Sequence, residues 1–212
     1  MVFIIKRVSD YNFRELNNQY IFVASTVFNE LLVESFPMDM ETNGFLGYAF
    51  IDHEQGMGVE VLCTGNFNAE SKALRLEKED VLSRVTIPME AIAEMDIIVV
   101  PSNAPVLEIF SAKVKLVNLE HACAENVLAT RNVVNMDSCR RNYYPDDIYV
   151  QLIKGDEQIE QCSVRVEGIE KFSLYGTLLN EPTKEFGVHQ GDKISFFNVK
   201  NAQGIMCIAV FE

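Results

Sequence analysis

The sequence predicts an α+β protein with two lobes, a mixed α/β lobe over residues 1–145 and a β-rich lobe over residues 146–212. The first reason is that the tail holds about five short strand-like runs separated by polar turns, which is typical of a small antiparallel β-sheet or an open barrel. The second is that the preceding segment mixes strand-like runs with helical spacing. The third is composition, since 212 residues with 48% hydrophobic and 23% charged side chains can build a sizeable core.

The N-terminal lobe is expected to begin with two strands and a helix. Residues 2–8 and 20–24 are apolar runs of strand length. Ser25 and Thr26 then offer side-chain oxygens that can cap the start of a helix. That helix should end near Pro37, because the residue before a proline is disfavoured in the α region.

A β-hairpin should follow this helix. Residues 44–51 and 57–64 read as two strands, and the polar residues 52–56, which end in glycine, make a suitable connection between them. Residues 66–80 are polar and charged with a few apolar anchors, and we expect a loop there, followed by a short strand or helix.

The rest of the N-terminal lobe is expected to be largely helical. Residues 88–95 begin with proline and carry an early acidic residue, and both features favour a short helix. Residues 96–100 follow as an apolar strand. Residues 103–142 place apolar side chains near helical spacing and indicate one long helix or a broken pair. The turn-rich stretch 142–147 marks the boundary between the lobes.

The C-terminal lobe should consist of short strands joined by polar turns. One of these runs alternates polar and apolar residues, as a half-buried strand does. The expected strands cover residues 148–153, 161–167, 172–179, 193–199 and 204–211.

Residues 178–192 (LLNEPTKEFGVHQGD) connect two of these strands. Their composition fits either a simple turn or a binding site. Pro182 fixes its own φ angle, and Gly187 and Gly191 permit backbone angles that a Cβ atom disfavours. Asp192 is well placed to accept a hydrogen bond from a turn amide. Turn chemistry therefore accounts for this stretch without a ligand.

A binding surface is the alternative interpretation of the same stretch, because loops on a rigid sheet often carry function. Phe186, His189 and Asp192 are its candidate binding residues, and His189 is its titratable group near neutral pH. Tyr143 and Tyr144 are further candidate aromatic anchors.

The tail also carries a characteristic spacing of glycine, asparagine, proline and aspartate. Residues 176–182 read GTLLNEP and residues 187–196 read GVHQGDKISF. This G-x-L-x-N-x-P segment before a G-D-x-I-x-F strand resembles the tail of certain small bacterial domains of unknown function, some of which are classed as polymorphic-toxin immunity proteins. The resemblance covers residues 147–212, implies a binding role, and supplies no catalytic residue.

A small-substrate hydrolase is the alternative function. Cys63 and His53 could meet across the predicted hairpin as a nucleophile and base, and paired carboxylates could act as acid and base. Cys63 follows apolar residues in a predicted strand, however, where a thiol usually behaves as a small hydrophobe. We expect no catalytic residue.

His121, Cys123 and Cys139 are the metal-ligand types that we considered as a group. Zinc usually takes four ligands at compact spacings, whereas these are three, and an i, i+2 spacing on a helix directs two side chains apart. We therefore expect no metal and no cofactor.

The net charge of −13 bears on the partner. Such a chain repels nucleic-acid backbones and anionic membranes, and it suits a protein partner with a basic surface. Arg140 and Arg141 lie beside the two tyrosines, but this basic cluster is too short to favour nucleic-acid binding against the net negative charge. The two arginines are expected to pair with Asp146 and Asp147.

Five cysteines without a CxxC motif favour a reducing, cytoplasmic setting. We expect a non-catalytic bacterial binding protein, in its most specific form an immunity-type protein that neutralises a basic partner.

Overall fold

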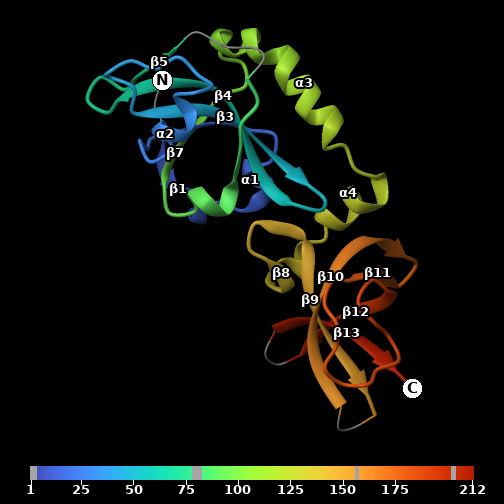
Figure 1. Cartoon of the computed structure of the whole chain (residues 1–212). Coiled ribbons are helices and arrows are strands. Elements are labelled where there is room, and N and C mark those ends of the chain that lie inside the picture. Colours follow the sequence, from blue (N-terminus) through green and yellow to red (C-terminus); the bar gives the residue numbers. More distant parts are fainter. Residues whose placement is uncertain (1–3, 78–82, 156–157, 202–203) are drawn as a thin grey trace. The chain divides into compact units, whose positions relative to one another are not determined.

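The computed structural model of this chain describes residues 4–77, 83–155, 158–201 and 204–212. It has the predicted α+β class and divides into two compact units, Met1–Ala122 and Cys123–Glu212 (Figure 1). Each unit contains a β-sheet of its own. The division falls earlier in the chain than the expected boundary after residue 145, so residues 123–145 belong with the second unit.

A seven-stranded sheet forms the centre of the first unit, with the order β1-β7-β2-β3-β4-β5 and with β6 paired to β4. Neighbouring strands run antiparallel in every described pairing of this sheet. The strands are β1 (Ile5–Arg7), β2 (Tyr20–Val23), β3 (Gly44–Asp52), β4 (Gly56–Asn68), β5 (Ala73–Leu76), β6 (Thr86–Pro88) and β7 (Asp96–Val100).

The hairpin of β3 and β4 confirms the hairpin expected from the sequence. Asp52 pairs with Gly56 at the turn, where Gly56 has a φ of 80°. The Asp52 carboxylate accepts hydrogen bonds from the backbone N–H groups of Glu54 and Gln55 at 2.8 and 2.7 Å. Nearly all residues of both strands are buried, which explains why each strand reads as a continuous apolar run.

Short helices accompany this sheet. The helix expected before Pro37 is a single turn, and the helix expected over residues 88–95 is a 3₁₀ turn. The long helical region is a broken series, of which η3 and α3 belong to the first unit. The helices of the first unit are η1 (Val8–Asp10), α1 (Phe13–Leu16), α2 (Asn29–Leu32), η2 (Met89–Ile92), η3 (Pro105–Phe110) and α3 (Ser111–Glu120).

The core on one side of this sheet is completed by η3 and α3. Phe110, Val114 and Val117 are the buried residues through which these helices join it, together with Leu107. The strands contribute Phe22, Leu46, Tyr48, Phe50, Leu62, Cys63, Phe67, Ile98 and Val100. The short strand or helix expected within residues 66–80 is seen as the strand β5. Residues 78–82 lie outside the described residues, as do residues 2 and 3 of the expected first strand.

The second unit is a closed barrel of five strands. The order β10-β11-β12-β13-β9 is completed by a pairing between β9 and β10. Along the chain, the five strands form an up-and-down meander that begins with β9 and ends with β13. Consecutive strands alternate in direction, so the first and the fifth point the same way. The pair of β13 and β9 that joins the two ends of the meander is therefore parallel. The five barrel strands are β9 (Tyr144–Lys154), β10 (Gln158–Glu170), β11 (Ser173–Leu178), β12 (Lys193–Asn201) and β13 (Gly204–Phe211). The short strand β8 (Arg140–Arg141) pairs with β9 outside this ring.

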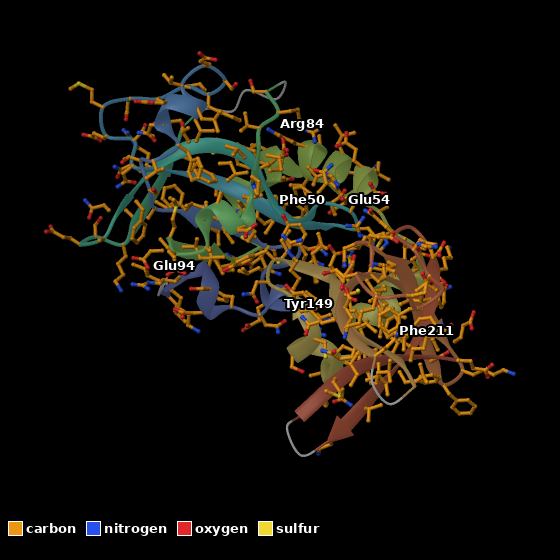
Figure 2. The ribbon with its side chains drawn as sticks, turned by 60° about the horizontal axis from the view of Figure 1, so that its bottom comes forward. Phe50, Glu54, Arg84, Glu94, Tyr149 and Phe211 are labelled. Atoms are coloured by element: carbon orange, nitrogen blue, oxygen red, sulfur yellow. The ribbon has the colours of Figure 1, made fainter. Side chains whose placement is uncertain are left out.

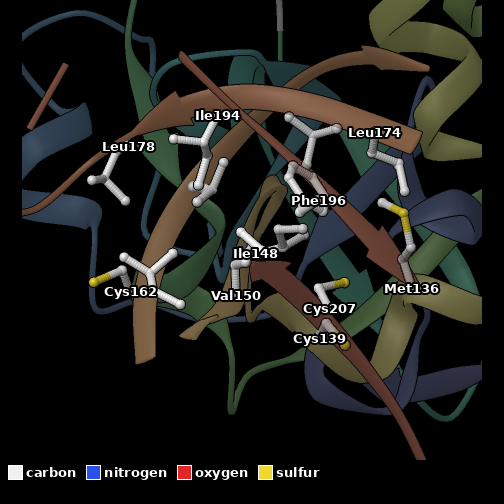
Figure 3. Close-up of a cluster of buried hydrophobic side chains, with 14 of the residues drawn as sticks. Met136, Cys139, Ile148, Val150, Cys162, Leu174, Leu178, Ile194, Phe196 and Cys207 are labelled. Atoms are coloured by element: carbon white, nitrogen blue, oxygen red, sulfur yellow. The ribbon is translucent and has the colours of Figure 1, made fainter. Parts of the chain in front are cut away.

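The barrel interior is filled by alternate residues of these strands (Figure 3). Val150, Val164, Phe196 and Cys207 are among the members that point inward. Gly176 lets β11 approach β10 closely, because a Cβ atom at this position would lie 2.1 Å from the carbonyl oxygen of Arg165.

Residues 123–145 are part of this unit because they pack on the barrel and pair with its charges. Met136 and Cys139 of η4 (Val134–Cys139) belong to the barrel core. Arg131, at the end of α4 (Glu125–Arg131), donates from Nε and Nη2 to the Asp146 carboxylate at 2.9 and 2.6 Å. The stretch expected to be a turn-rich boundary therefore lies largely in β9, which begins at Tyr144.

Candidate binding surfaces

The stretch at residues 178–192 is a loop held by its own hydrogen bonds. The Asp192 carboxylate accepts a hydrogen bond from the His189 backbone N–H at 2.7 Å, which confirms its expected turn role. The Glu160 carboxylate accepts from the backbone N–H groups of Thr183 and Lys184 at 2.8 and 3.0 Å. Gly187 and Gly191 have φ angles of 79° and 91°, in the region that favours glycine. Turn chemistry therefore explains this loop.

Phe186 anchors the loop to the barrel. Its side chain is only 3% exposed and packs on Phe211, with ring centroids 5.9 Å apart. The ring is thus part of the barrel core and is not available to a partner. The two other candidate residues of the loop, His189 and Asp192, are exposed.

His189 is oriented by an acidic neighbour. The Glu181 carboxylate lies 2.7 Å from His189 Nδ1, and it also accepts a hydrogen bond from the Gln190 backbone N–H at 2.8 Å. The hydrogen bond and charge of Glu181 raise the pKa of His189, and Asp192 and Glu185 add to this effect. Because its Nδ1 contacts Glu181 within the loop, the His189 side chain stabilises the loop conformation.

Tyr143 and Tyr144 lie at the hairpin between β8 and β9. Tyr143 has a φ of 61°, which fits a tight turn, and Arg141 pairs with Tyr144 across it. The Arg141 guanidinium lies 4.1 Å from the centroid of the Tyr144 ring, a cation–π contact. Both tyrosines are half-buried.

The expected pairing of Arg140 and Arg141 with the two aspartates is wrong. Asp146 is bound by Arg131, and Asp147 accepts a hydrogen bond from Arg165 Nε at 2.9 Å. Arg140 instead donates to Asp137 at 3.0 Å and to the backbone carbonyl of Thr130 at 2.7 Å. Arg165 lies opposite Asp147 on β10, and Arg131 reaches Asp146 from the end of α4, so both carboxylates are already paired with other cations.

Cys63 and His53 do not form the nucleophile and base of the alternative hydrolase. Cys63 pairs with Leu46 and is fully buried, whereas His53 lies in the turn beyond the Asp52 and Gly56 pair. The seven residues from Gly56 to Cys63 span about 23 Å at the rise of a β-strand. The hairpin therefore keeps the two side chains apart.

A histidine and a carboxylate do meet at another place in the first unit. His121 Nδ1 lies 2.8 Å from Asp52 Oδ2, and the imidazole stacks on Phe50 with ring centroids 4.0 Å apart. Burial raises the pKa of Asp52, but hydrogen bonds from the Gln55 amide, His121 and the Glu54 amide outweigh it, so the pKa lies below its usual value. The carboxylate thus accepts, and Nδ1 carries the proton. These contacts fasten the end of α3 to the β3–β4 turn.

A second polar cluster in the first unit is buried. Glu60 is 0% exposed and accepts hydrogen bonds from Arg84 Nε and the Thr86 hydroxyl, both at 2.8 Å. Lys113 Nζ donates to the carbonyls of Val61 and Ser83 at 2.7 and 2.6 Å and lies 3.4 Å from Glu60. Figure 2 labels Arg84 and Phe50, which mark these two clusters. Neither cluster was anticipated, because their members are far apart in sequence.

The strongest candidate for a binding surface is residues 25–43, here called the 25–43 segment. It exposes several large apolar side chains, of which Val27 is 72% exposed and Met40 is fully exposed. Leu31 and Val33 are more than half exposed. Large apolar side chains that gather on the surface of one segment are typical of protein-interaction sites.

Acidic residues alternate with these apolar side chains. Glu30 and Glu34 are exposed and make no ion pair with any residue that the structure describes. Asp39 and Glu41 both contact Arg75 of β5, the second at 3.5 Å. The segment therefore combines apolar contact area with negative charge. The sequence alone does not reveal this combination, because it does not tell the exposed apolar residues of the segment from the buried ones.

The 25–43 segment is fixed to the core from its inner side. Leu32 and Phe36 are buried, and the ring of Phe28 meets that of Phe45 at 88° with centroids 6.0 Å apart. The Thr64 hydroxyl donates to the Pro37 carbonyl oxygen. Since the buried residues hold the backbone in place, the exposed ones are presented in a defined arrangement.

The charge of the whole chain is concentrated in the same unit. Residues 1–122 hold 18 of the 31 acidic residues but 9 of the 18 basic ones, which gives −9 of the total −13. Several of these cations already contact carboxylates, including Arg7, Arg75 and Arg84. The first unit thus attracts a cationic partner more strongly than the second.

Comparison with protein-family models, with curated proteins and with solved structures found no match to this chain. Among the residues that the structure describes, no group of three or more His, Cys, Asp or Glu side chains is arranged to hold a metal ion. Within the same residues, no helix has the length and apolar character needed to cross a membrane.

Proposed function

We propose that this chain is a protein-binding protein whose first unit recognises a partner with a basic surface through the 25–43 segment. The observation that carries the proposal is the alternation of exposed apolar side chains with carboxylates on a segment that is fixed to the core. A partner that surrounds an apolar residue with lysines or arginines complements this surface. The apolar contacts supply affinity, and the charges accelerate association.

The more specific form of the proposal is an immunity-type protein that neutralises a basic toxin in the bacterial cytoplasm. The resemblance of residues 147–212 to immunity-type bacterial domains supports this form. The net charge of −13 supports a protein partner over nucleic acid or an anionic membrane, because both of these carry the same sign of charge.

The test is affinity capture from the native lysate with the full chain, followed by titration of the captured, purified protein. The charge variant Glu30→Lys/Glu34→Lys should lose most of the binding, since it replaces two exposed carboxylates with cations. The apolar variant Val27→Ser/Leu31→Ser should weaken the same complex at every salt concentration. Binding of the unaltered chain should decrease as salt increases.

Two control variants separate the segment from the rest of the surface. Glu90→Lys makes one such Glu-to-Lys replacement at an exposed position of η2, and Val210→Ser removes an exposed apolar side chain from the second unit. Both should retain binding within about twofold, an effect of the size expected for positions outside an interface. A captured protein with an acidic surface, or equal loss in the control variants, would overturn the proposal.

A further inference from the structure

Two thiols lie next to each other inside the second unit. Cys139 is the last residue of η4, and Cys207 lies in β13. Their side chains lie side by side in the barrel core, where they are 6% and 1% exposed (Figure 3). The Cys207 thiol donates to Asn198 Oδ1 at 3.0 Å. All five cysteines of the chain are in the thiol form. The barrel core therefore contains two neighbouring thiols.

The surroundings make the two thiols chemically different. The hydrogen bond from Cys207 lowers the pKa of Cys139 to about 6 against the opposing effect of burial, with smaller contributions from Ser138, the Cys207 backbone N–H and Arg140. The same hydrogen bond and burial raise the pKa of Cys207. While neutral, the Cys139 thiol donates to the Ile205 carbonyl at 3.5 Å.

We propose that Cys139 and Cys207 form an oxidation site at which a small neutral hydroperoxide, such as hydrogen peroxide, produces an intramolecular disulfide. The geometry carries this proposal, because Cys139 Sγ packs against β13 two residues from Cys207, and the two side chains are neighbours in one core. Burial favours a small uncharged oxidant, since a bulky disulfide reagent has little access to either sulfur atom. The proposal is independent of the proposed binding function, because these residues lie inside the barrel core.

The reaction proceeds in two balanced steps. The Cys139 thiolate attacks one peroxide oxygen, the O–O bond breaks, and the departing hydroxide takes up a proton to become water, which leaves a sulfenic acid on Cys139. Cys207 then loses its proton and attacks Cys139 Sγ, the S–O bond breaks, and a second water forms. Two thiols lose two electrons in total, and one peroxide is reduced to two waters.

The product joins η4 directly to β13, two elements that already share the barrel core. The sulfur atoms move to the bond length of about 2.05 Å. The new covalent link closes a long loop of the chain, so the oxidised second unit should unfold at a higher temperature than the reduced one.

The experiment treats the full chain with hydrogen peroxide, blocks the remaining thiols by alkylation, and maps the peptides without reduction. We expect a linked peptide that joins Cys139 to Cys207 and a decrease in mass of about 2 Da. The control Cys162→Ser removes a thiol that is buried to the same degree in the same core, and it should leave the linkage intact. Since the main result is obtained with the unaltered chain, it does not depend on a variant that folds.

Cys207→Ser identifies the order of the steps. Without the second thiol, Cys139 should remain a sulfenic acid that reacts with dimedone, and the linked peptide should be lost. Absence of the Cys139–Cys207 peptide from the treated, unaltered chain would overturn the proposal. So would a linkage that forms through Cys123 or Cys162 instead.

Discussion

Lys113 illustrates how one buried side chain can connect several parts of the first unit. Its ammonium group is bonded to the carbonyl oxygens of Val61 and Ser83 and lies beside the carboxylate of Glu60. A buried charge is tolerated only when its hydrogen bonds and its counter-charge are supplied by the protein. Removal of one member therefore leaves the others without compensation.

Lys113→Met is expected to lower the free energy of unfolding of the first unit by about 3 kcal/mol, because the Glu60 carboxylate and two carbonyl groups lose a buried partner. Lys115→Met is the control, since Lys115 lies on the same helix and is exposed, and it should change stability by less than about 0.5 kcal/mol. Urea denaturation, followed through hydrogen exchange of first-unit amides, measures both. Equal midpoints for the two variants would contradict the assigned role of Lys113.

His189 gives the loop at residues 178–192 a dependence on pH. Its pKa is raised in the folded state, chiefly by Glu181, so the protonated imidazole is the form that the loop favours. The contribution is complete below the ordinary pKa of about 6.5 and is lost as the pH rises through the higher folded value. An NMR titration of the imidazole should give a midpoint above about 6.5. Glu181→Gln should lower that midpoint, and an unchanged midpoint would disprove the pairing.

The elements that the sequence predicted well are those specified by local pattern. The hairpin of β3 and β4 was predicted because a glycine-ended polar turn separates two apolar runs. The tail strands were predicted because polar turns interrupt short apolar runs. The start of β9 was missed, since two adjacent aspartates suggest a turn until Arg131 and Arg165 are seen to neutralise them.

The candidate sites were less predictable than the strands. The turn role of Asp192 followed from its immediate neighbours and was confirmed. The contact of Asp52 with His121 joins residues that are distant in the chain, and no local signal announces it. The 25–43 segment was missed for a related reason, because its exposed apolar residues cannot be told from its buried ones until the sheet beneath them is in place.

Phe186 is another residue whose burial could not be predicted from the sequence, and its role in the core can be tested. Phe186→Ala should destabilise the second unit by about 3 kcal/mol, because it leaves a cavity beside Phe211 in the barrel core. Phe172→Ala is the matched control, since Phe172 is 92% exposed and its loss should have little effect. Thermal unfolding of the two variants makes the comparison. Similar unfolding temperatures would show that the loop does not complete the core.

At the scale of the whole molecule, the division of the chain can be tested with fragments. Residues 123–212 should fold alone, because they include η4 and the Arg131 partner of Asp146. Residues 146–212 should not, since they lose those core residues and leave a buried carboxylate unpaired. Circular dichroism and amide NMR spectra of both fragments provide the measurement. Well-dispersed spectra from the shorter fragment would return the boundary to residue 145.

The closure of the barrel by its parallel pair has a consequence for unwanted association. A complete ring of strands presents no unpaired edge to which another chain can add a strand, whereas an open sheet keeps one edge at each end. In the first unit one such edge is β1, and it carries Lys6 and Arg7. Edge-strand charges of this kind oppose aggregation and domain swapping, so the first unit is protected by repulsion and the second by its topology.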